Sequence, residues 1–129
     1  RYQPAVVSIA LGTNDLSNGD GKKPRAPFDS ARFVNEYVKF VQQVRLKYNS
    51  SRIAILSSPM MNGERRILLQ NCLTAVKNEV DRSSPSKDRV ALYFFKPMQA
   101  RGCTGHPNVE DHAEMAEELI PFFRRLLQP

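Results

Sequence analysis

Three short apolar runs along the chain predict β-strands. They occupy residues 5–11 (AVVSIAL), 52–56 (RIAIL) and 90–95 (VALYFF). The runs are rich in β-branched and aromatic residues, and the first is bounded by Pro4 and Gly12, which favour turns. Because the runs are apolar almost throughout, rather than alternating with polar residues, we expect strands that are covered on both faces, as in a parallel sheet.

Between these runs, apolar residues recur at steps of three and four, which predicts amphipathic helices. The first helix is expected over 29–48, and the second follows Asn62, a residue type that favours the N-cap. Residues 83–88 (SSPSKD) are a polar connection to the third run. The stripes expected to face the core are Phe33, Val34, Tyr37, Val38, Val41, Val44 and Tyr48 in the first helix and Leu68, Leu69, Cys72, Leu73, Val76 and Val80 in the second.

A third helix is predicted after Asn108, which is expected to cap it. Its first turn is acidic (Glu110, Asp111) and its last turn is basic (Arg124, Arg125), so charges complement the helix dipole at both ends. The stripe expected to face the core consists of His112, Ala116, Leu119, Ile120 and Phe123. On this pattern His112 is interpreted as a packed histidine rather than a catalytic one.

The predicted order of elements is therefore strand, helix, strand, helix, strand, helix. Strands that alternate with helices imply right-handed crossovers and a parallel sheet sandwiched between helices. A length of 129 residues suits one small α/β domain, so residues 1–129 are expected to form a single domain. The sequence predicts an α/β fold, a three-layer αβα sandwich with about three parallel strands.

Composition is typical of a soluble globular protein, with 41% hydrophobic and 25% charged residues. No apolar run approaches the roughly 20 residues that a membrane-spanning helix needs. The formal net charge of +6 favours acidic partners, but the basic residues are scattered among acids without interleaved aromatics, which indicates a solvated surface. We therefore expect no nucleic-acid partner and no membrane association. The chain begins at Arg1 without a signal-peptide pattern, as expected for a processed or truncated product.

Two cysteines, Cys72 and Cys103, leave two alternatives open. They form one disulfide, or they are two free buried thiols. Their spacing gives no metal-ligand pattern, and no residue cluster implies a metal ion or an organic cofactor. We therefore expect a site without either.

Candidate polar chemistry follows the ends of the predicted strands. In open parallel sheets, ligands bind beyond the carboxyl ends of the strands. Those ends are followed by residues 12–21, 57–63 and 96–108, so all three loops are expected on one rim of the molecule. In the third loop, His106 stands between a glycine and Pro107. A histidine held in this way at a ligand rim is a better candidate for a catalytic base than an ordinary surface histidine.

The loop after the first predicted strand offers a hydrogen-bond donor. Gly12 allows the backbone to come close to a ligand, and Asn14 carries a side-chain amide that can donate. Asn14 and Asp15 are equally typical of an ordinary turn, because both residue types bond to their own backbone there. The spacing alone leaves both interpretations open.

Two segments together resemble a known family. IALGTND (9–15), followed far downstream by GCTGHPNVEDHAEMAEEL (102–119), is similar to the SGNH, or GDSL-type, hydrolases and most closely to the acetyl esterases of carbohydrate esterase family 2. The resemblance extends over essentially the entire chain. It implies a flavodoxin-like fold and a secreted serine esterase that removes acetyl groups from xylan or similar glycans. It also implies that Asn14 is an oxyanion-hole donor and that His106 is the catalytic base.

The sequence departs from the family pattern in two respects. Thr104 stands where the family usually has the aspartate that orients the histidine, and Gly105 stands where an aromatic residue often follows. Some members work as a Ser-His dyad, with backbone carbonyls holding the ring. The Gly-Asp-Ser block with the nucleophile is absent, as is the block with an oxyanion-hole glycine, so the chain resembles the C-terminal part of the domain.

Two hypotheses on function follow. In the first, the chain is a minimal esterase that uses His106 and Asn14 with a substitute serine, a nucleophile from a partner, or an activated water. In the second, it is a non-catalytic remnant that keeps the fold and binds acylated carbohydrate. The match to the family pattern favours the esterase. The candidate nucleophiles are serines near the predicted rim, each also typical of turns: Ser17, Ser57 and Ser58.

The missing part of the family domain predicts an exposed sheet edge. Val6, Val7 and Ile9 would lie on an edge that neighbouring strands cover in the family. Exposed apolar edges invite pairing with another chain. We therefore expect a homo-oligomer, or a complex with a complementary fragment.

Overall fold

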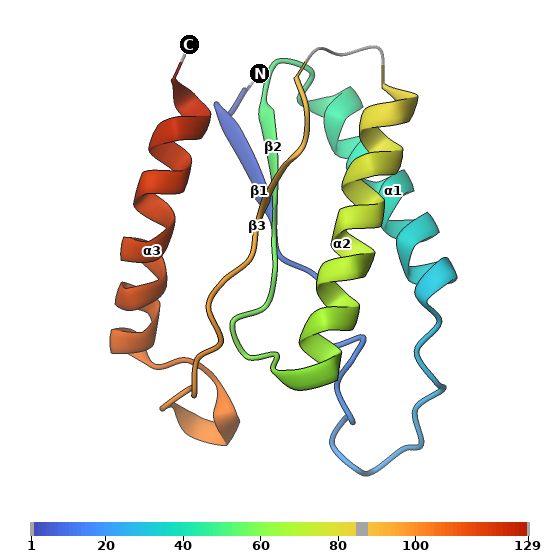
Figure 1. Ribbon diagram of the computed structural model, residues 1–129, viewed down its shortest axis with the longest axis vertical. Helices are drawn as coiled ribbons and strands as arrows, with labels where there is room; N and C mark the ends of the chain where they lie inside the picture. The colour runs from blue at the N-terminus through green and yellow to red at the C-terminus, as the bar shows by residue number, and fades with distance from the viewer. Residues whose placement is uncertain (1, 85–87, 129) are drawn as a thin grey trace.

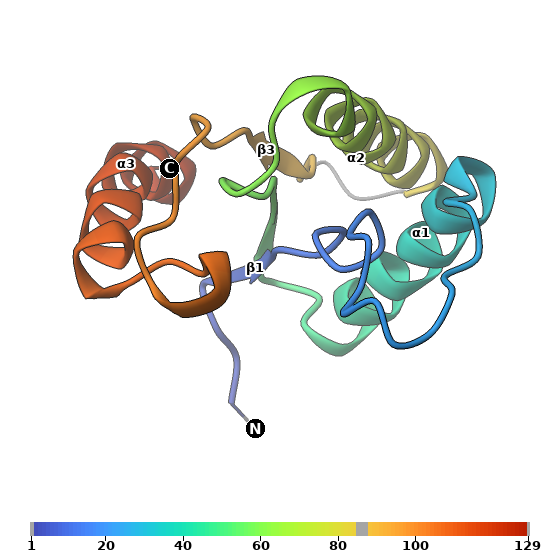
Figure 2. The same ribbon diagram turned by 90° about the horizontal axis from the view of Figure 1, so that it is seen from below.

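The computed structural model describes residues 2–84 and 88–128. It contains a parallel sheet in the strand order β1-β2-β3, with α1 and α2 on one face and α3 on the other (Figures 1 and 2). This arrangement confirms the predicted three-layer αβα fold and the predicted order of elements. The strands are β1 (Val6–Ile9), β2 (Arg52–Leu56) and β3 (Ala91–Tyr93), the helices are α1 (Ser30–Lys47), α2 (Gly63–Ser83) and α3 (Val109–Leu127), and a short 3-10 turn is η1 (Cys103–Gly105).

The two faces of the sheet have cores of unequal size. In β2, Ile53 and Ile55 point toward α1 and α2, whereas Ala54 and Leu56 point toward α3. The core on the α1 and α2 face contains 13 buried side chains. The core on the α3 face contains three, which are Ala54, Leu56 and Phe95, and the side chains of α3 around them are only partly buried. Helix α3 is therefore held by less buried apolar surface than the other two helices.

Helices α1 and α2 largely confirm the predicted stripes. The side chain of Asp29 accepts a hydrogen bond from the Arg32 N–H (3.0 Å) and so caps α1. Asn62 occupies the N-cap position of α2, but its side chain makes no capping hydrogen bond. Leu68 lies off the buried stripe and is 36% exposed. The buried residues of the two helices are Tyr37, Val38, Val41, Leu69, Cys72, Leu73, Val76 and Val80.

The orientation of α3 about its axis corrects the sequence prediction. His112, Ala116 and Ile120 are exposed, so His112 is a surface residue and not a packed one. Leu119 and Phe123 do pack toward the sheet, as predicted. Asp111 is buried on the same side of the helix as Leu119, so its neighbour His112 faces outward. The side chains of α3 that pack toward the sheet are Met115, Leu119, Phe122, Phe123 and Leu126.

Strands β1 and β3 are shorter than the apolar runs that predicted them. The ladder between β2 and β3 ends at the pair Leu56 and Tyr93. Beyond it, the Ser57 N–H donates to the Tyr93 carbonyl (2.9 Å), and the Phe95 N–H donates to Ser57 Oγ (2.9 Å). Because a side chain takes the place of the next main-chain partner, the chain leaves the sheet at this point while Phe95 stays buried.

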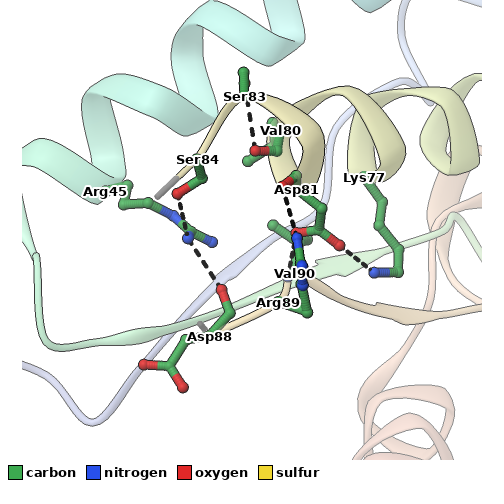
Figure 3. A network of polar contacts seen from close by, with 9 residues as sticks. All are labelled: Arg45, Lys77, Val80, Asp81, Ser83, Ser84, Asp88, Arg89 and Val90. Atoms are coloured by element: carbon green, nitrogen blue, oxygen red, sulfur yellow. Dashed lines mark hydrogen bonds and ion pairs between the residues drawn. The ribbon is translucent and has the colours of Figure 1, made fainter. Parts of the chain in front are cut away.

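A polar network at the opposite end of the sheet ties α2 to its neighbours (Figure 3). The Asp81 carboxylate accepts from the Val90 N–H (2.9 Å), which leads into β3, and Arg45 of α1 donates to Ser84 Oγ (3.0 Å). These bonds hold the end of α2 against α1 and β3. Of the polar connection predicted over 83–88, residues 85–87 lie outside the described residues.

Both cysteines are free thiols, which excludes the disulfide alternative. Cys72 is buried in α2, and burial raises the pKa of its thiol. Cys103 is exposed in η1, so the expectation of two buried thiols was wrong for this residue. The exposed position follows from η1 itself, which projects from the rim and has no buried residue.

Strand β1 forms an edge of the sheet, since within residues 2–84 and 88–128 it pairs only with β2. Val6 and Val7 are partly buried, Ser8 is exposed, and Ile9 is only 6% exposed because it packs into the larger core. The apolar edge is therefore smaller than the sequence predicted. What it offers to a partner is mainly the unpaired backbone along its outer side.

Candidate active site

The loops that follow the three strands lie at the same end of the sheet, at the bottom of Figure 1 and toward the viewer in Figure 2. They connect β1 to α1, β2 to α2, and β3 to α3. Asn14 lies in the first loop, Ser57 and Ser58 in the second, and His106 in the third. The structure therefore confirms that the candidate polar residues share one rim.

His106 is exposed on a turn that its own backbone closes. The Gly102 N–H donates to the His106 carbonyl (2.8 Å), and the His106 N–H donates to the Cys103 carbonyl (3.2 Å). A Cβ atom at position 102 would lie 2.5 Å from the His106 carbonyl oxygen, so the chain can cross itself here only with glycine. This crossing fixes the backbone that carries the imidazole at the rim.

Thr104 contacts the imidazole directly. Its Oγ1 lies 3.0 Å from Nδ1 of His106 and donates a hydrogen bond to the Cys103 carbonyl (2.7 Å). Thr104 has φ 54° and ψ 28°, and it is the only non-glycine residue with positive φ in the described ranges. A β-branched residue rarely adopts this left-handed conformation. Gly105, which follows it, has φ 75° and completes the turn.

A buried carboxylate anchors the His106 loop to α3. Asp111 is 1% exposed, and its Oδ2 accepts from the main-chain N–H groups of Arg101 (2.8 Å) and Asn108 (2.9 Å). Its other oxygen pairs with the Arg101 guanidinium. These donors, first the main-chain N–H of Arg101, lower the pKa of Asp111. In return, Asn108 Oδ1 accepts from the Asp111 N–H (2.8 Å), which completes a capping box.

The sequence missed this role of Asp111. Its position in the first turn indicated only a favourable interaction with the helix dipole. The signal that was available is the spacing Asn-x-x-Asp at the helix start, which suits a capping box. The bonds to Arg101 come from ten positions upstream and carry no sequence signature.

The loop after β1 holds Asn14 through its main chain. Gly12 is buried with φ 112°, and a Cβ there would overlap the Leu69 side chain of α2, so this end of the loop lies close against the helix. The Asn14 carbonyl accepts from the Ser17 N–H (3.3 Å), while the Asn14 and Asp15 side chains are exposed. The loop is thus an ordinary turn that also leaves the Asn14 amide at the surface, and the two sequence interpretations are compatible.

The structure brings none of the three candidate serines into a described hydrogen bond with His106. Ser57 is 3% exposed and Ser58 is 7% exposed, and each hydroxyl accepts from a nearby main-chain N–H. Ser17 is partly exposed, and its hydroxyl donates to the Asn14 carbonyl (3.1 Å). Ser57 and Ser58 therefore act as buried turn residues in this chain, and only Ser17 of the three reaches the surface.

A groove of about 470 Å³ lies beside the first loop and the start of α1. Leu11 and Asp15 line one side of it, but neither Asn14 nor His106 is among its lining residues. The candidate site is therefore an open rim rather than a closed pocket. The aromatic residues in the groove are Phe28, Phe33, Tyr37 and Phe40.

Within residues 2–84 and 88–128, no group of three or more His, Cys, Asp or Glu side chains is arranged to hold a metal ion. In the same part of the chain, no helix is both long enough and apolar enough to cross a membrane.

Comparisons with known proteins give curated relatives whose names are those of esterases, although no family model matches the sequence. The chain is 34% identical over 124 residues to the cellulase/esterase CelE of Acetivibrio thermocellus, covering 92% of this chain and 14% of that protein. It is 27% identical over 127 residues to an acetylxylan esterase / glucomannan deacetylase of Cellvibrio japonicus, covering 98% of this chain and 32% of that protein.

Among solved structures, the chain is similar to a family two carbohydrate esterase from Clostridium thermocellum in complex with cellohexaose. The TM-score is 0.77 at 30% identity, and the match covers 98% of this chain and 37% of that one. The chain thus spans about a third of the length of this structure and of the Cellvibrio relative. These similarities confirm the fold and the resemblance to carbohydrate esterases that the two sequence segments indicated.

Proposed function

We propose that this chain, whose relatives are carbohydrate esterases of family 2, provides the base and an oxyanion donor of a site that removes acetyl groups from xylan or similar glycans. His106 is the base, and the Asn14 side-chain amide is the donor. The observation that carries the proposal is the exposed His106, in a loop whose backbone crosses at Gly102, at the same end of the sheet as the loop that carries Asn14. The acetylxylan substrate is taken from the name of the Cellvibrio relative. A polymeric glycan substrate also agrees with the secretion of this protein, which the family resemblance implies and which forms part of the proposal.

Hydrolysis follows from the chemistry of these two groups. Nε2 of His106 takes the proton of a nucleophilic O–H group while the oxygen bonds to the ester carbonyl carbon. The carbonyl oxygen becomes an oxyanion, which the Asn14 amide stabilises by a hydrogen bond. The C–O bond to the sugar then breaks, and the sugar oxygen takes the proton back from His106. With water as the nucleophile, acetic acid is released, whereas a serine forms an acetyl-enzyme that water cleaves in a second round.

The serines of the loop between β2 and α2 are poorly placed to act as the nucleophile. Ser57 and Ser58 are buried with their hydroxyls engaged, and Ser17 is bonded within its own turn. We propose that a segment which adds to the free edge of β1, from a second copy or a complementary fragment, completes the site. In the chain by itself, we propose water as the nucleophile, with the partly exposed Ser17 as the alternative once its bond to the Asn14 carbonyl is broken.

The edge proposal predicts self-association of the purified chain. At micromolar concentration we expect a species larger than a monomer, because the outer backbone of β1 is unpaired. Ser8→Lys should shift the chain toward the monomer, since Ser8 is exposed on β1 and a lysine there discourages pairing without removing a packed side chain. Sedimentation velocity measures both. A wild-type monomer over this concentration range would contradict self-association.

The oxyanion role is tested by Asn14→Ala. We expect acetate release from acetylated xylan to fall about 10²- to 10³-fold, as for the loss of one oxyanion donor. The loop should persist, because the Asn14 main-chain carbonyl and not its side chain receives the turn hydrogen bonds. Asn18→Ala, at an exposed asparagine of the same loop, is the matched control. It removes a hydrogen bond that Asn18 Oδ1 accepts from Arg65 of α2 but no proposed oxyanion donor, so it should keep the wild-type rate.

Two results would count against the esterase. Equal rates for the Asn14→Ala and Asn18→Ala chains would remove Asn14 from the site. A wild-type chain that releases no acetate but binds acetylated xylan would favour the non-catalytic alternative. The assay should use acetylated glycan rather than activated aryl acetates, because a free, exposed thiol such as that of Cys103 is a competing nucleophile toward aryl esters.

A further inference from the structure

We propose that Thr104 replaces the orienting aspartate of the family, with its hydroxyl accepting the Nδ1–H of His106 and so leaving the Nε2 lone pair free. This inference rests on the proposed function of His106 as the base. It makes Thr104 a positioning residue, because it acts on the substrate only through the imidazole.

The direction of the hydrogen bond follows from counting protons. The Thr104 hydroxyl has one proton and contacts two groups, the Cys103 carbonyl at 2.7 Å and Nδ1 of His106 at 3.0 Å. A carbonyl oxygen can only accept, and two oxygens without a proton between them would repel at 2.7 Å. The hydroxyl proton therefore lies toward Cys103, and the contact with Nδ1 requires its proton to come from the imidazole.

The tautomer that results is the one a base needs. Neutral imidazole carries a single N–H, so a proton on Nδ1 leaves Nε2 unprotonated. Nδ1 faces the Thr104 hydroxyl, and Nε2 is the ring nitrogen left for a nucleophile. The Cys103 carbonyl also accepts from the His106 main-chain N–H, so both ends of His106 are tied to the same short turn.

The backbone at Thr104 supports a functional reason for this residue. Its left-handed conformation suits glycine or asparagine better than a β-branched side chain. No contact of the Thr104 methyl group contributes to a described core, because η1 has no buried residue. The hydroxyl contacts to Cys103 and His106 are the described interactions that a glycine in its place would lose.

The tautomer is tested by ¹⁵N NMR of the histidine rings in the full chain, at a pH where the imidazoles are neutral. We expect the Nδ1–H form to predominate for His106 in the wild type and in Thr104→Ser, which keeps the hydroxyl. In Thr104→Val we expect the Nε2–H form that imidazole prefers in water. His112, exposed on α3, gives a reference signal in the same spectra. Acetate release should fall at least roughly tenfold in Thr104→Val, as when a catalytic histidine is held in the wrong tautomer, and recover in Thr104→Ser.

A glycine variant separates folding from positioning. Thr104→Gly removes the hydroxyl and relieves the left-handed backbone, so it should be at least as heat-stable as the wild type while losing the Nδ1–H preference. An Nε2–H form of His106 in the wild type, or an Nδ1–H form that survives in Thr104→Val and Thr104→Gly, would overturn the inference. If the tautomers behave as expected and neither the wild type nor any variant releases acetate, the control of the His106 tautomer by Thr104 stands and the proposed esterase function fails.

Discussion

Replacing His106 by alanine is expected to lower acetate release from acetylated xylan about 10²- to 10⁴-fold, the contribution typical of a general base. The effect should be chemical rather than structural. The His106 side chain is exposed, and the hydrogen bonds that close its turn are made by its main chain, which the variant keeps. Circular dichroism and the melting temperature should therefore match those of the wild type.

The chain provides its own control for this experiment. His112 is the other histidine, and it is exposed on the first turn of α3. His112→Ala removes the same chemical group a short distance along the chain, so it should leave acetate release unchanged. A similar loss in both variants, or in neither, would contradict the assignment of the base to His106.

Asp111→Ala is expected to produce the largest loss of stability of any change near the site. The substitution leaves the main-chain N–H groups of Arg101 and Asn108 without their acceptor and the Arg101 guanidinium without its buried partner. Unsatisfied buried donors are among the costly consequences of single substitutions. We expect the melting temperature to fall by roughly 10 °C, together with a loss of acetate release because the His106 loop is no longer anchored.

Glu110→Ala is the matched control for Asp111. Glu110 is the neighbouring acid in the first turn of α3, and its side chain is exposed. Its removal should change the melting temperature only slightly, because the remaining effect is a screened interaction with the helix dipole. Thermal unfolding followed by circular dichroism compares the two variants. Equal shifts would show that Asp111 acts only through its charge at the helix end.

The Asp111 carboxylate also makes the stability of the protein dependent on pH in the acidic range. The pKa of Asp111 is lowered from its usual 3.8, chiefly by the main-chain N–H donors. A carboxyl group with a lowered pKa in the folded state stabilises the fold above its unfolded pKa and loses this contribution as the pH falls through the folded value. The destabilisation by Asp111→Asn should therefore be full at neutral pH and shrink when the wild type is acidified below about pH 3.8.

The elements that the sequence predicted well are those determined by the local pattern of apolar residues. Strand β2 was predicted over 52–56 and found there, because it is apolar on both faces and lies at the centre of the sheet. The α3 stripe was wrong in its orientation, because the apolar residues of that helix span a wide arc. The part of the arc that faces inward lies on the same side of the helix as Asp111, whose contacts with Arg101 the apolar pattern does not reveal.

In the candidate site, too, the sequence predicted some features, while others depend on tertiary contacts. The strand-end rule placed Asn14 and His106 on one rim, which depends only on the order of strands and helices. The contact between Thr104 and the imidazole depends on a left-handed backbone conformation at Thr104, which cannot be predicted from the presence of a threonine. The burial of Ser57 depends on the point where the chain leaves β3, where its hydroxyl replaces a ladder partner. Such contacts are set by tertiary packing and not by residue type.

The unequal cores on the two faces of the sheet imply that the molecule unfolds locally, with one face less stable than the other. Amide hydrogens of β2, α1 and α2 should exchange with solvent slowest, because the larger core protects them. Helix α3 rests on three buried side chains and should detach more often by local unfolding. Since Asp111 joins the His106 turn to α3, each such excursion carries the base away from the rim. The time for which the site stays assembled is thus set by the local unfolding of α3 and not by the unfolding of the larger core.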